Sequence, residues 1–170
     1  MAAGKSTLAK KIARSLSFQF IDTDKYIESI TGLSISEFIR SSGIDAFRME
    51  EHKALNEIIK MDNSVVATGG GLPCFYNNMD IIKGNGFSIY IKYAPGIIFH
   101  RIKNAHTERP LVKGMNDDEM IKFIENTLIE REPFYNKANC VLNKKNVKTE
   151  DLLMPILEYL ENNIQTHGNI

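Results

Sequence analysis

The first residues of the chain could bind phosphate. Gly4, Lys5 and Ser6 match the second half of the pattern G-x-x-x-x-G-K-[ST]. In that pattern the glycine lets backbone N–H groups face the phosphates of a nucleotide, the lysine adds a positive charge, and the hydroxyl binds Mg²⁺. Apolar residues between positions 8 and 16 recur at helical spacing, so a helix should open at the loop and direct its positive end at the anion. The sequence therefore predicts an ATP site here.

The upstream half of this pattern is absent from the chain. Its first glycine would stand five positions before Gly4, where the sequence has no residue. A phosphate loop normally follows directly after a β-strand. We therefore expect that the chain lacks this strand and that Met1 is an internal methionine.

Two other groups of residues follow predicted strands. Asp22 and Asp24 come at the end of an apolar run at 18–22, and three glycines follow the β-branched run at 64–68. Open parallel sheets bind ligands at the carboxyl ends of their strands. Consecutive glycines there indicate a backbone that passes close to another group. A plain loop would explain the glycines as well, and turn or helix-cap positions would explain the two acids.

These residues need a scaffold in which strands and helices alternate. Periodicity, capping residues and turn residues predict this alternation along the whole chain. We expect strands near 18–22, 64–68, 87–91 and 138–142. Helices are expected at the following places: directly after the phosphate loop, from about Tyr26 to 31, from Ser34 onward, over 44–60, around 81–82, from Pro95 onward, from Asp117 to 131–133, and from Thr149 onward. The fold class is α/β, a doubly wound parallel sheet with helices on both faces.

Some boundaries rest on single residues. We expect Gly84 to Gly86 to form a turn and the helix from Asp117 to end at 131–133. Pro155 should kink the last helix or move its start, because proline lacks an N–H. The polar tail from Asn162 should fray. The stretch 104–115 lacks an apolar period and is expected to be a mobile loop.

Composition excludes several classes of protein. With 170 residues and 43% apolar content, the chain predicts one domain covering 1–170. Lys plus Arg and Asp plus Glu both number 21, so no net field attracts nucleic acid or an anionic membrane. No run of eighteen apolar residues predicts a membrane span, and we expect a cytoplasmic protein. Cys74 and Cys140 are widely separated and are expected to be free thiols.

Taken together, the motifs resemble the shikimate kinases, a family of small P-loop kinases. The resemblance covers nearly the whole chain, and it depends on six motifs that follow one another in the family's order. They are Gly4-Lys5-Ser6-Thr7, Phe20 to Asp24, Phe47-Arg48 with Glu50 and Glu51, Thr68-Gly69-Gly70-Gly71, Arg109-Pro110-Leu111, and Arg131 with Tyr135. One departure is Ala2, which stands where the family's phosphate loop commonly has glycine.

The resemblance implies an enzyme that uses ATP and Mg²⁺ to phosphorylate the 3-hydroxyl of shikimate, in the chorismate pathway of aromatic amino acid biosynthesis. It implies that Asp24 accepts the hydroxyl proton and that Asp22 holds Mg²⁺ together with Ser6. Arg48 and Arg131 would bind the substrate carboxylate, with an N–H of Gly70 adding a contact. The binding partners would be the small-molecule substrates shikimate and ATP. The protein would be a monomer.

The resemblance also assigns regions. Residues Ala2, Ala3, Gly4, Lys5, Ser6 and Thr7 would bind the nucleotide, and Gly69, Gly70 and Gly71 would line the substrate site. Lys5 and Arg109 would share in catalysis, with Arg109 on a lid at 104–115 that closes over ATP.

The family's strand order, 2-3-1-4-5, implies that the absent strand is the central one. The strands near 65–66 and 89–90 would then lie about 9–10 Å apart, with unpaired backbone groups on their facing edges.

Two other functions remain open from the residues alone. A related small-molecule kinase, such as a gluconate kinase, would share the loop and the lid without needing both arginines. A non-catalytic nucleotide-binding module would keep Lys5 and Ser6 and would have no use for Asp24, Arg48 and Arg131 together.

Overall fold

The structure is a computed structural model that describes residues 3–104, 112 and 114–167, with side chains described as far as residue 162. The helices are α1 (Lys5–Leu16), α2 (Thr23–Thr31), α3 (Ile35–Ser42), α4 (Ile44–Ile58), α5 (Asn78–Asn85), α6 (Pro95–Lys103), α7 (Asp117–Tyr135) and α8 (Thr149–His167), and a 3₁₀ turn covers Leu72–Cys74. The strands are β1 (Gln19–Asp22), β2 (Ser64–Ala67), β3 (Ile89–Lys92) and β4 (Cys140–Asn143).

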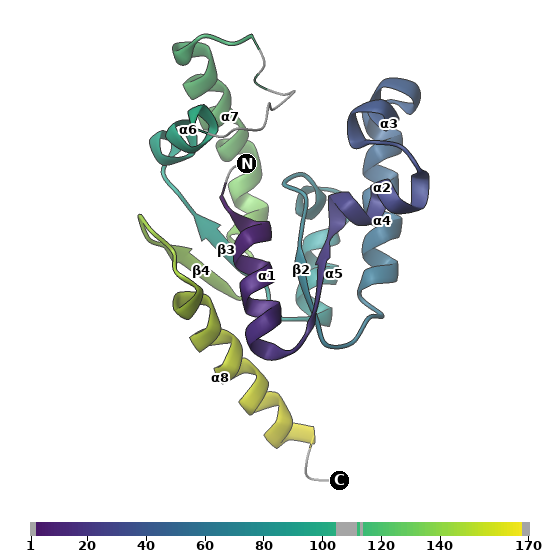
Figure 1. Cartoon of the computed structure of the whole chain (residues 1–170), viewed down its shortest axis with the longest axis vertical. Helices are drawn as coiled ribbons and strands as arrows, with labels where there is room; N and C mark the ends of the chain where they lie inside the picture. Colours follow the sequence, from purple (N-terminus) through teal and green to yellow (C-terminus); the bar gives the residue numbers. More distant parts are fainter. Residues whose placement is uncertain (1–2, 105–111, 113, 168–170) are drawn as a thin grey trace.

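The strands form two parallel pairs. In the first pair β1 runs beside β2, with Gln19 opposite Ser64, and in the second β3 runs beside β4, with Ile89 opposite Cys140. Figure 1 shows the first pair with α2 to α5 on one side of the molecule and the second with α6 to α8 on the other. The alternating, parallel α/β architecture predicted from the sequence is confirmed.

The strands β2 and β3 do not pair. Each of the two sheets contains two strands, and β2 and β3 belong to different sheets. The expectation that the strands near 65–66 and 89–90 do not hydrogen-bond directly is therefore confirmed. One edge of each of these strands faces a groove instead of a partner strand.

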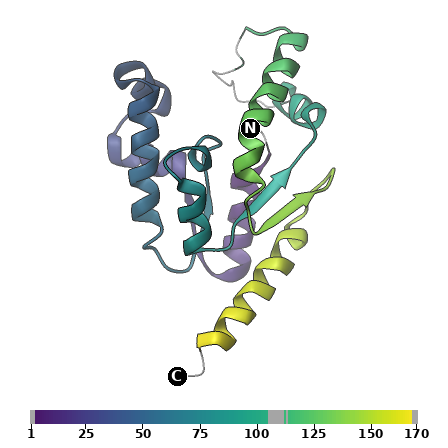
Figure 2. The same ribbon diagram turned by 180° about the vertical axis from the view of Figure 1, so that it is seen from behind.

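The buried core is likewise divided between the two halves. One cluster packs around α6 and α7 and contains Ala3, Tyr93, Ile98, Ile102, Val112, Met120 and Ile124. The other packs between α2 and α4 and contains Ile27, Phe47 and Ala54. Helix α1 lies between the halves and contacts β1, β2 and α8, while Figure 2 shows α5 on the opposite face of the strands.

Two predicted helix ends, those of α5 and α7, are wrong. Gly84 and Asn85 belong to α5, which ends at Asn85 with Gly86 as its C-cap, whereas the sequence predicted a turn from Gly84 to Gly86. Helix α7 continues through Pro133 to Tyr135. Pro133 has no N–H to donate to the carbonyl of Ile129. Residue Ile129 is 72% exposed, so water can hydrogen-bond to this carbonyl.

The last helix also differs from expectation. Helix α8 starts at Thr149 despite Pro155, and it extends to His167 where a frayed tail from Asn162 was expected. None of the described helices is long and apolar enough to cross a membrane. Cys74 and Cys140 are free thiols, as predicted.

Candidate active site

The phosphate loop leads directly into α1. Gly4 is the N-cap residue and has a left-handed φ of 74°, a conformation that glycine adopts without a Cβ penalty. Lys5, Ser6 and Thr7 then form the first turn of the helix, where backbone N–H groups have no intrahelical partner. The described part of the loop therefore directs the positive dipole end of α1 at the place where an anion would bind, as the sequence predicts.

Ser6 and Asp22 meet at the beginning of α2. The Ser6 hydroxyl donates to Asp22 Oδ2 at 2.6 Å. The other carboxylate oxygen, Oδ1, accepts from the backbone N–H groups of Asp24 and Lys25 at 3.2 and 3.4 Å, so Asp22 caps α2. Asp22 is thus both a helix cap and a candidate metal ligand, since the two roles use different oxygens.

Asp24 lies on the first turn of α2 and faces the three-glycine turn. Burial raises the pKa of its carboxyl group, and the neighbouring Asp22 carboxylate raises it further, while Lys5 and Arg48 act in the opposite direction. The charges of Lys5, in the phosphate loop, and of Arg48 thus both act on Asp24. A carboxylate in this setting holds a proton more readily than a solvated one does.

The glycines allow other side chains to come close. A Cβ on Gly69 would stand 2.5 Å from Asp24 Oδ1 and 3.1 Å from Glu51 Oε1. A Cβ on Gly71 would overlap the Arg48 guanidinium, with Cζ only 2.6 Å away. The sequence predicts a close backbone approach at these glycines, and the structure identifies the groups that approach.

Arg48 and Glu51 form a buried ion pair at this turn. The side chains are 14% and 2% exposed, and Arg48 Nη1 donates to Glu51 Oε2. Burial raises the pKa of Glu51, and its hydrogen bond from Arg48 counteracts that rise. The buried Arg48 Nε has no hydrogen-bond partner among the described residues. A buried guanidinium donor without a partner is costly, so this corner is suited to an additional acceptor.

Arg131 reaches the same corner from α7 through Tyr135. Arg131 hydrogen-bonds the Tyr135 hydroxyl, which itself donates to the carbonyl of Gly70. Burial raises the pKa of Tyr135, and Arg131 acts to lower it. The positive charge of Arg131 also acts on Glu51. The structure therefore brings the two arginines to one site, although they are 83 residues apart (131 − 48).

Several side chains of this site were not predicted as functional. The Thr23 hydroxyl accepts from the N–H of Gly69 at 2.7 Å and ties α2 to the turn. Arg101 donates to the carbonyl of Ala3 at 3.2 Å and lies over the ring of Tyr93 at 4.1 Å. Thr23 lies inside the motif Phe20 to Asp24, but only its two acids were predicted as functional, and Arg101 belongs to no motif.

Part of the predicted site lies outside the described residues. This applies to Ala2, to Arg109 and to the segment 105–111 of the expected lid. Among the residues that the structure describes, no cluster of three or more His, Cys, Asp or Glu side chains could hold a metal by itself.

Comparison with known proteins shows one family. A family model described as shikimate kinase matches residues 1–161. A curated shikimate kinase of Bacteroides thetaiotaomicron is 39% identical, over 84% of this chain and 82% of the relative. One of Caldanaerobacter subterraneus is 35% identical, over 92% and 90% of the two chains.

Solved structures give the same result. The crystal structure of shikimate kinase from Bacteroides thetaiotaomicron aligns with a TM-score of 0.87 at 36% identity, over 95% of this chain and 94% of that one. Shikimate kinase from Acinetobacter baumannii in complex with shikimate aligns with a TM-score of 0.80 at 29% identity, over 96% and 89%.

Proposed function

Because this chain belongs to the shikimate kinase family, we propose that the side chains around the Gly69–Gly71 turn perform the family's reaction. That reaction transfers the γ-phosphoryl group of ATP to the 3-hydroxyl of shikimate, a step of chorismate biosynthesis. The resemblance and the geometry together support a role for particular residues of this chain in each part of the reaction.

The observation that carries the assignment is the buried guanidinium of Arg48. Glu51 occupies one of its nitrogens, and Nε has no partner among the described residues. Shikimate carries a carboxylate, and arginine binds a carboxylate through two parallel charge-assisted hydrogen bonds. Arg48 would hold that carboxylate, and Arg131 would supply a second positive charge from α7.

The Gly69–Gly71 turn would form the floor of the substrate site. Its carbonyl at Gly70 accepts from Tyr135, and its amide at Gly69 donates to Thr23. These bonds fix the turn from two helices, which favours a stable position for the N–H groups that face substrate. Tyr135 would act as a positioning residue, because it contacts both Arg131 and the turn.

Asp24 would accept the proton of the attacking hydroxyl. The 3-hydroxyl oxygen forms a bond to the γ-phosphorus while the bond from that phosphorus to the ADP oxygen breaks, and the hydroxyl proton passes to Asp24. A carboxylate whose pKa is raised is a stronger base than a solvated aspartate. Lys5, which influences Asp24 electrostatically, would also face the transferred phosphoryl group.

The family is ATP-dependent and generally requires a divalent metal. Mg²⁺ is commonly held by one or two carboxylates together with nucleotide phosphates. Ser6 Oγ and Asp22 Oδ2, 2.6 Å apart beside the phosphate loop, fit this donor set. Bound there, Mg²⁺ would offset the negative charge of the nucleotide phosphates.

A substrate panel tests the proposal. With ATP and Mg²⁺, we expect ADP release with shikimate and none above background with gluconate or with a cyclohexene carboxylate that lacks the 3-hydroxyl. Equal turnover of gluconate would contradict the role of the arginine pair. Tight ATP binding without phosphotransfer to any member of the panel would contradict catalysis.

A further inference from the structure

The segment 72–78, which follows the glycine turn, forms a wall beside Arg48. Gly71 immediately precedes the segment, and a Cβ there would stand 2.6 Å from the guanidinium carbon of Arg48. Within the segment, the ring of Phe75 lies 4.7 Å from the same guanidinium. The place of this wall therefore decides how much room remains for a carboxylate at Arg48.

The backbone of this segment needs to be held from outside. Tyr76 and Asn77 have positive φ values of 51° and 57°, a left-handed conformation that is disfavoured for residues with a Cβ. Such a backbone persists only where neighbouring groups over-determine it. One neighbour is His52 of α4, whose ring centroid lies 5.3 Å from that of Tyr76.

Asn78 holds the segment together from its buried side. Its side chain is fully buried, and its Nδ2 donates to the carbonyl of Leu72 at 2.8 Å. Its backbone N–H donates to the carbonyl of Phe75 at 2.9 Å. The remaining polar atom of the side chain, Oδ1, lies 2.6 Å from Nδ1 of His52. His52 thus connects α4 to the residue that closes the segment.

The surrounding hydrogen bonds determine which nitrogen of His52 carries the proton. A carbonyl can only accept, so the Asn78 atom that faces Leu72 is the amide nitrogen and the atom that faces His52 is the oxygen. Nδ1 of His52 must then donate. Asn56 Nδ2 donates to the carbonyl of His52 at 2.8 Å and faces Nε2 at 3.2 Å, so Nε2 accepts. A neutral imidazole protonated on Nδ1 satisfies all of these bonds.

We propose that His52 is a positioning residue for the substrate carboxylate: its Nδ1–H holds Asn78, and through Asn78 the segment 72–78, against the Arg48 guanidinium. The inference rests on the proposed function, because it requires that Arg48 binds that carboxylate. His52 follows Arg48 by about one turn of α4. The helix that supplies the arginine therefore also fixes the wall beside it.

Two substitutions separate the two nitrogens of His52. The amide of asparagine occupies the place of Nδ1 and can donate to Asn78, whereas the amide of glutamine occupies the place of Nε2. We expect the Kd for shikimate to rise by about fivefold or more in His52→Gln and by less than about twofold in His52→Asn. The Kd for ATP should be unchanged in both variants. Because glutamine forms helices better than asparagine does, a loss of helix stability alone would produce the opposite order.

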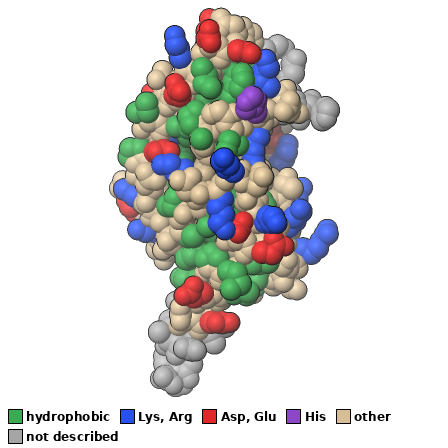
Figure 3. Space-filling view, turned by 90° about the vertical axis from the view of Figure 1, so that its left-hand side faces the viewer, with side chains coloured by type: hydrophobic (Ala, Val, Ile, Leu, Met, Phe, Trp, Pro, Cys, Tyr) green, Lys and Arg blue, Asp and Glu red, His purple; other side chains and the backbone are tan. Residues whose placement is uncertain are grey.

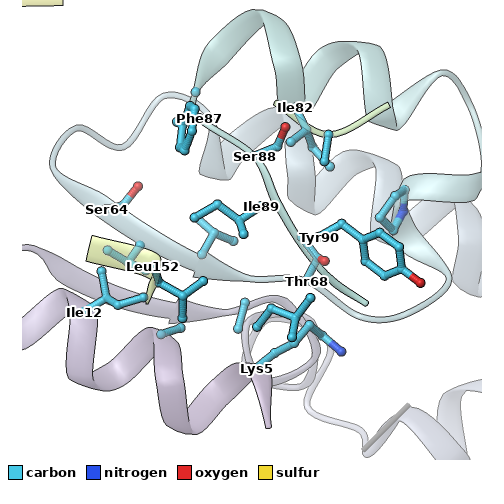
Figure 4. A pocket seen from close by; sticks show the side chains of 18 of the residues that line it. Lys5, Ile12, Ser64, Thr68, Ile82, Phe87, Ser88, Ile89, Tyr90 and Leu152 are labelled. Atoms are coloured by element: carbon cyan, nitrogen blue, oxygen red, sulfur yellow. The ribbon is translucent and has the colours of Figure 1, made fainter. Parts of the chain in front are cut away.

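The matched control is Asn139→Ala, which removes a polar connection far from Arg48. Asn139 Oδ1 accepts from the N–H and the hydroxyl of Ser88 at 3.0 and 2.6 Å. Figure 4 shows Phe87, the neighbour of Ser88, at one end of the pocket between β2 and β3, and Thr68, which leads into the glycine turn, at the other. We expect this variant to be less stable to urea and to bind shikimate as the unmodified protein does.

Two readouts need no ligand. Nitrogen NMR of the imidazole at mildly alkaline pH, where histidine is neutral, should show a protonated Nδ1 and an unprotonated Nε2 for His52. The N–H of Cys74 donates to the carbonyl of Gly71 at 2.9 Å. Its hydrogen exchange should be faster by about tenfold in His52→Gln than in His52→Asn.

Several results would overturn the inference. They are a proton on Nε2 of His52, shikimate affinity in His52→Gln equal to that of the unmodified protein, equal weakening in His52→Asn, and weakening of ATP binding to the same extent. Weakened shikimate binding in Asn139→Ala would assign the effect to general stability. Failure of the unmodified protein to bind shikimate would contradict the proposed function instead. The imidazole tautomer and the Cys74 exchange would then still decide whether His52 holds the segment.

Discussion

Asp24 sits where its negative charge is disfavoured. Burial and the Asp22 carboxylate raise its pKa. The side chain also lies close to the backbone of Gly69, where an added Cβ would stand only 2.5 Å from Asp24 Oδ1. Replacing Asp24 by Asn keeps the shape and removes the proton acceptor. We expect Asp24→Asn to lower kcat by about 10²–10⁴ and to leave the Kd for ATP nearly unchanged, as measured by steady-state kinetics and calorimetry. Turnover near that of the unmodified protein would remove Asp24 from the mechanism.

The same substitution has a pH-dependent effect on stability that serves as a control for folding. Because the folded-state pKa of Asp24 is raised, its contribution to stability is fully present below the unfolded pKa of about 3.9. It is lost as the pH rises through the folded value. At neutral pH, Asp24→Asn should therefore be at least as stable to urea as the unmodified protein. A variant that is inactive and unstable at neutral pH would indicate misfolding instead of loss of the base.

Arg48 is constrained by shape as well as by charge. Glu51 binds one nitrogen, Phe75 lies 4.7 Å from the guanidinium carbon, and the Nε donor remains available. Lysine would keep the charge but not the planar fork. We expect Arg48→Lys to weaken shikimate binding by roughly 1.5–3 kcal/mol with ATP affinity unchanged. Calorimetry with each ligand alone checks this, and equal weakening for both ligands would indicate a folding defect.

At the scale of elements, Asp22 links the helix α2 to the nucleotide site. One oxygen caps the helix and the other accepts from Ser6. Asparagine caps a helix as well as aspartate does, whereas alanine does not, at a cost of about 1 kcal/mol. We expect Asp22→Asn and Asp22→Ala to weaken Mg²⁺-dependent ATP binding similarly, with the alanine variant alone losing about that much stability. Titration with Mg²⁺ and urea unfolding measure the two effects, and full Mg²⁺ dependence in Asp22→Asn would exclude Asp22 as a ligand.

The turn after β2 offers a matched pair of glycines. Gly71 has φ of −86°, so alanine would fit its backbone, but the Cβ would overlap Arg48. Gly84 lies inside α5 with open space around its Cα, so alanine there should stabilise the helix by about 0.5–1 kcal/mol. We expect Gly71→Ala to weaken shikimate binding by about tenfold or more, while Gly84→Ala leaves it unchanged. Equal shikimate affinity in both variants would show that Arg48 does not need its observed position.

The elements themselves were predictable to different degrees. The helix after Gly4, the capping box at Ser34 and the parallel strands follow from local patterns, and the structure contains them. The ends of α5 and α7 do not follow from local patterns. Whether a helix continues through Gly84 or Pro133 depends on solvent exposure and tertiary packing, which the local sequence does not determine. Glycine and proline rules predict an average cost, and the surrounding structure decides whether that cost ends a helix.

The candidate site was predictable where a motif marked it. Asp24, Arg48 and the glycine turn were all predicted through a family resemblance, and the structure brings them together. The roles of Thr23 and Arg101 were not predicted, because the motif Phe20 to Asp24 marked only the two acids beside Thr23 and no motif contains Arg101. Their contacts, with Gly69 and with Ala3, arise only when α2 and α6 pack beside the site.

At the scale of the whole molecule, the charge balance is visible on the surface. Figure 3 shows Lys and Arg side chains intermixed with Asp and Glu on one face, in agreement with equal totals of 21. A chain with equal numbers of positive and negative side chains has no net charge to create a long-range field of one sign. Recognition of anionic substrates must then come from local groups, such as the arginines and the end of α1.

The division of the sheet should also govern how the molecule opens. With no strand pairing between β2 and β3 and separate buried clusters around Ile124 and Ile27, the two halves meet through α1 and through the contact of α7 with the Gly70 turn and the 3₁₀ turn. We expect native-state hydrogen exchange in low urea to show two cooperative units with different opening free energies. Amides of β1 and β2 would report one unit, and amides of β3 and β4 the other. A single opening free energy for all four strands would show that α1 and the helical packing already couple the halves fully.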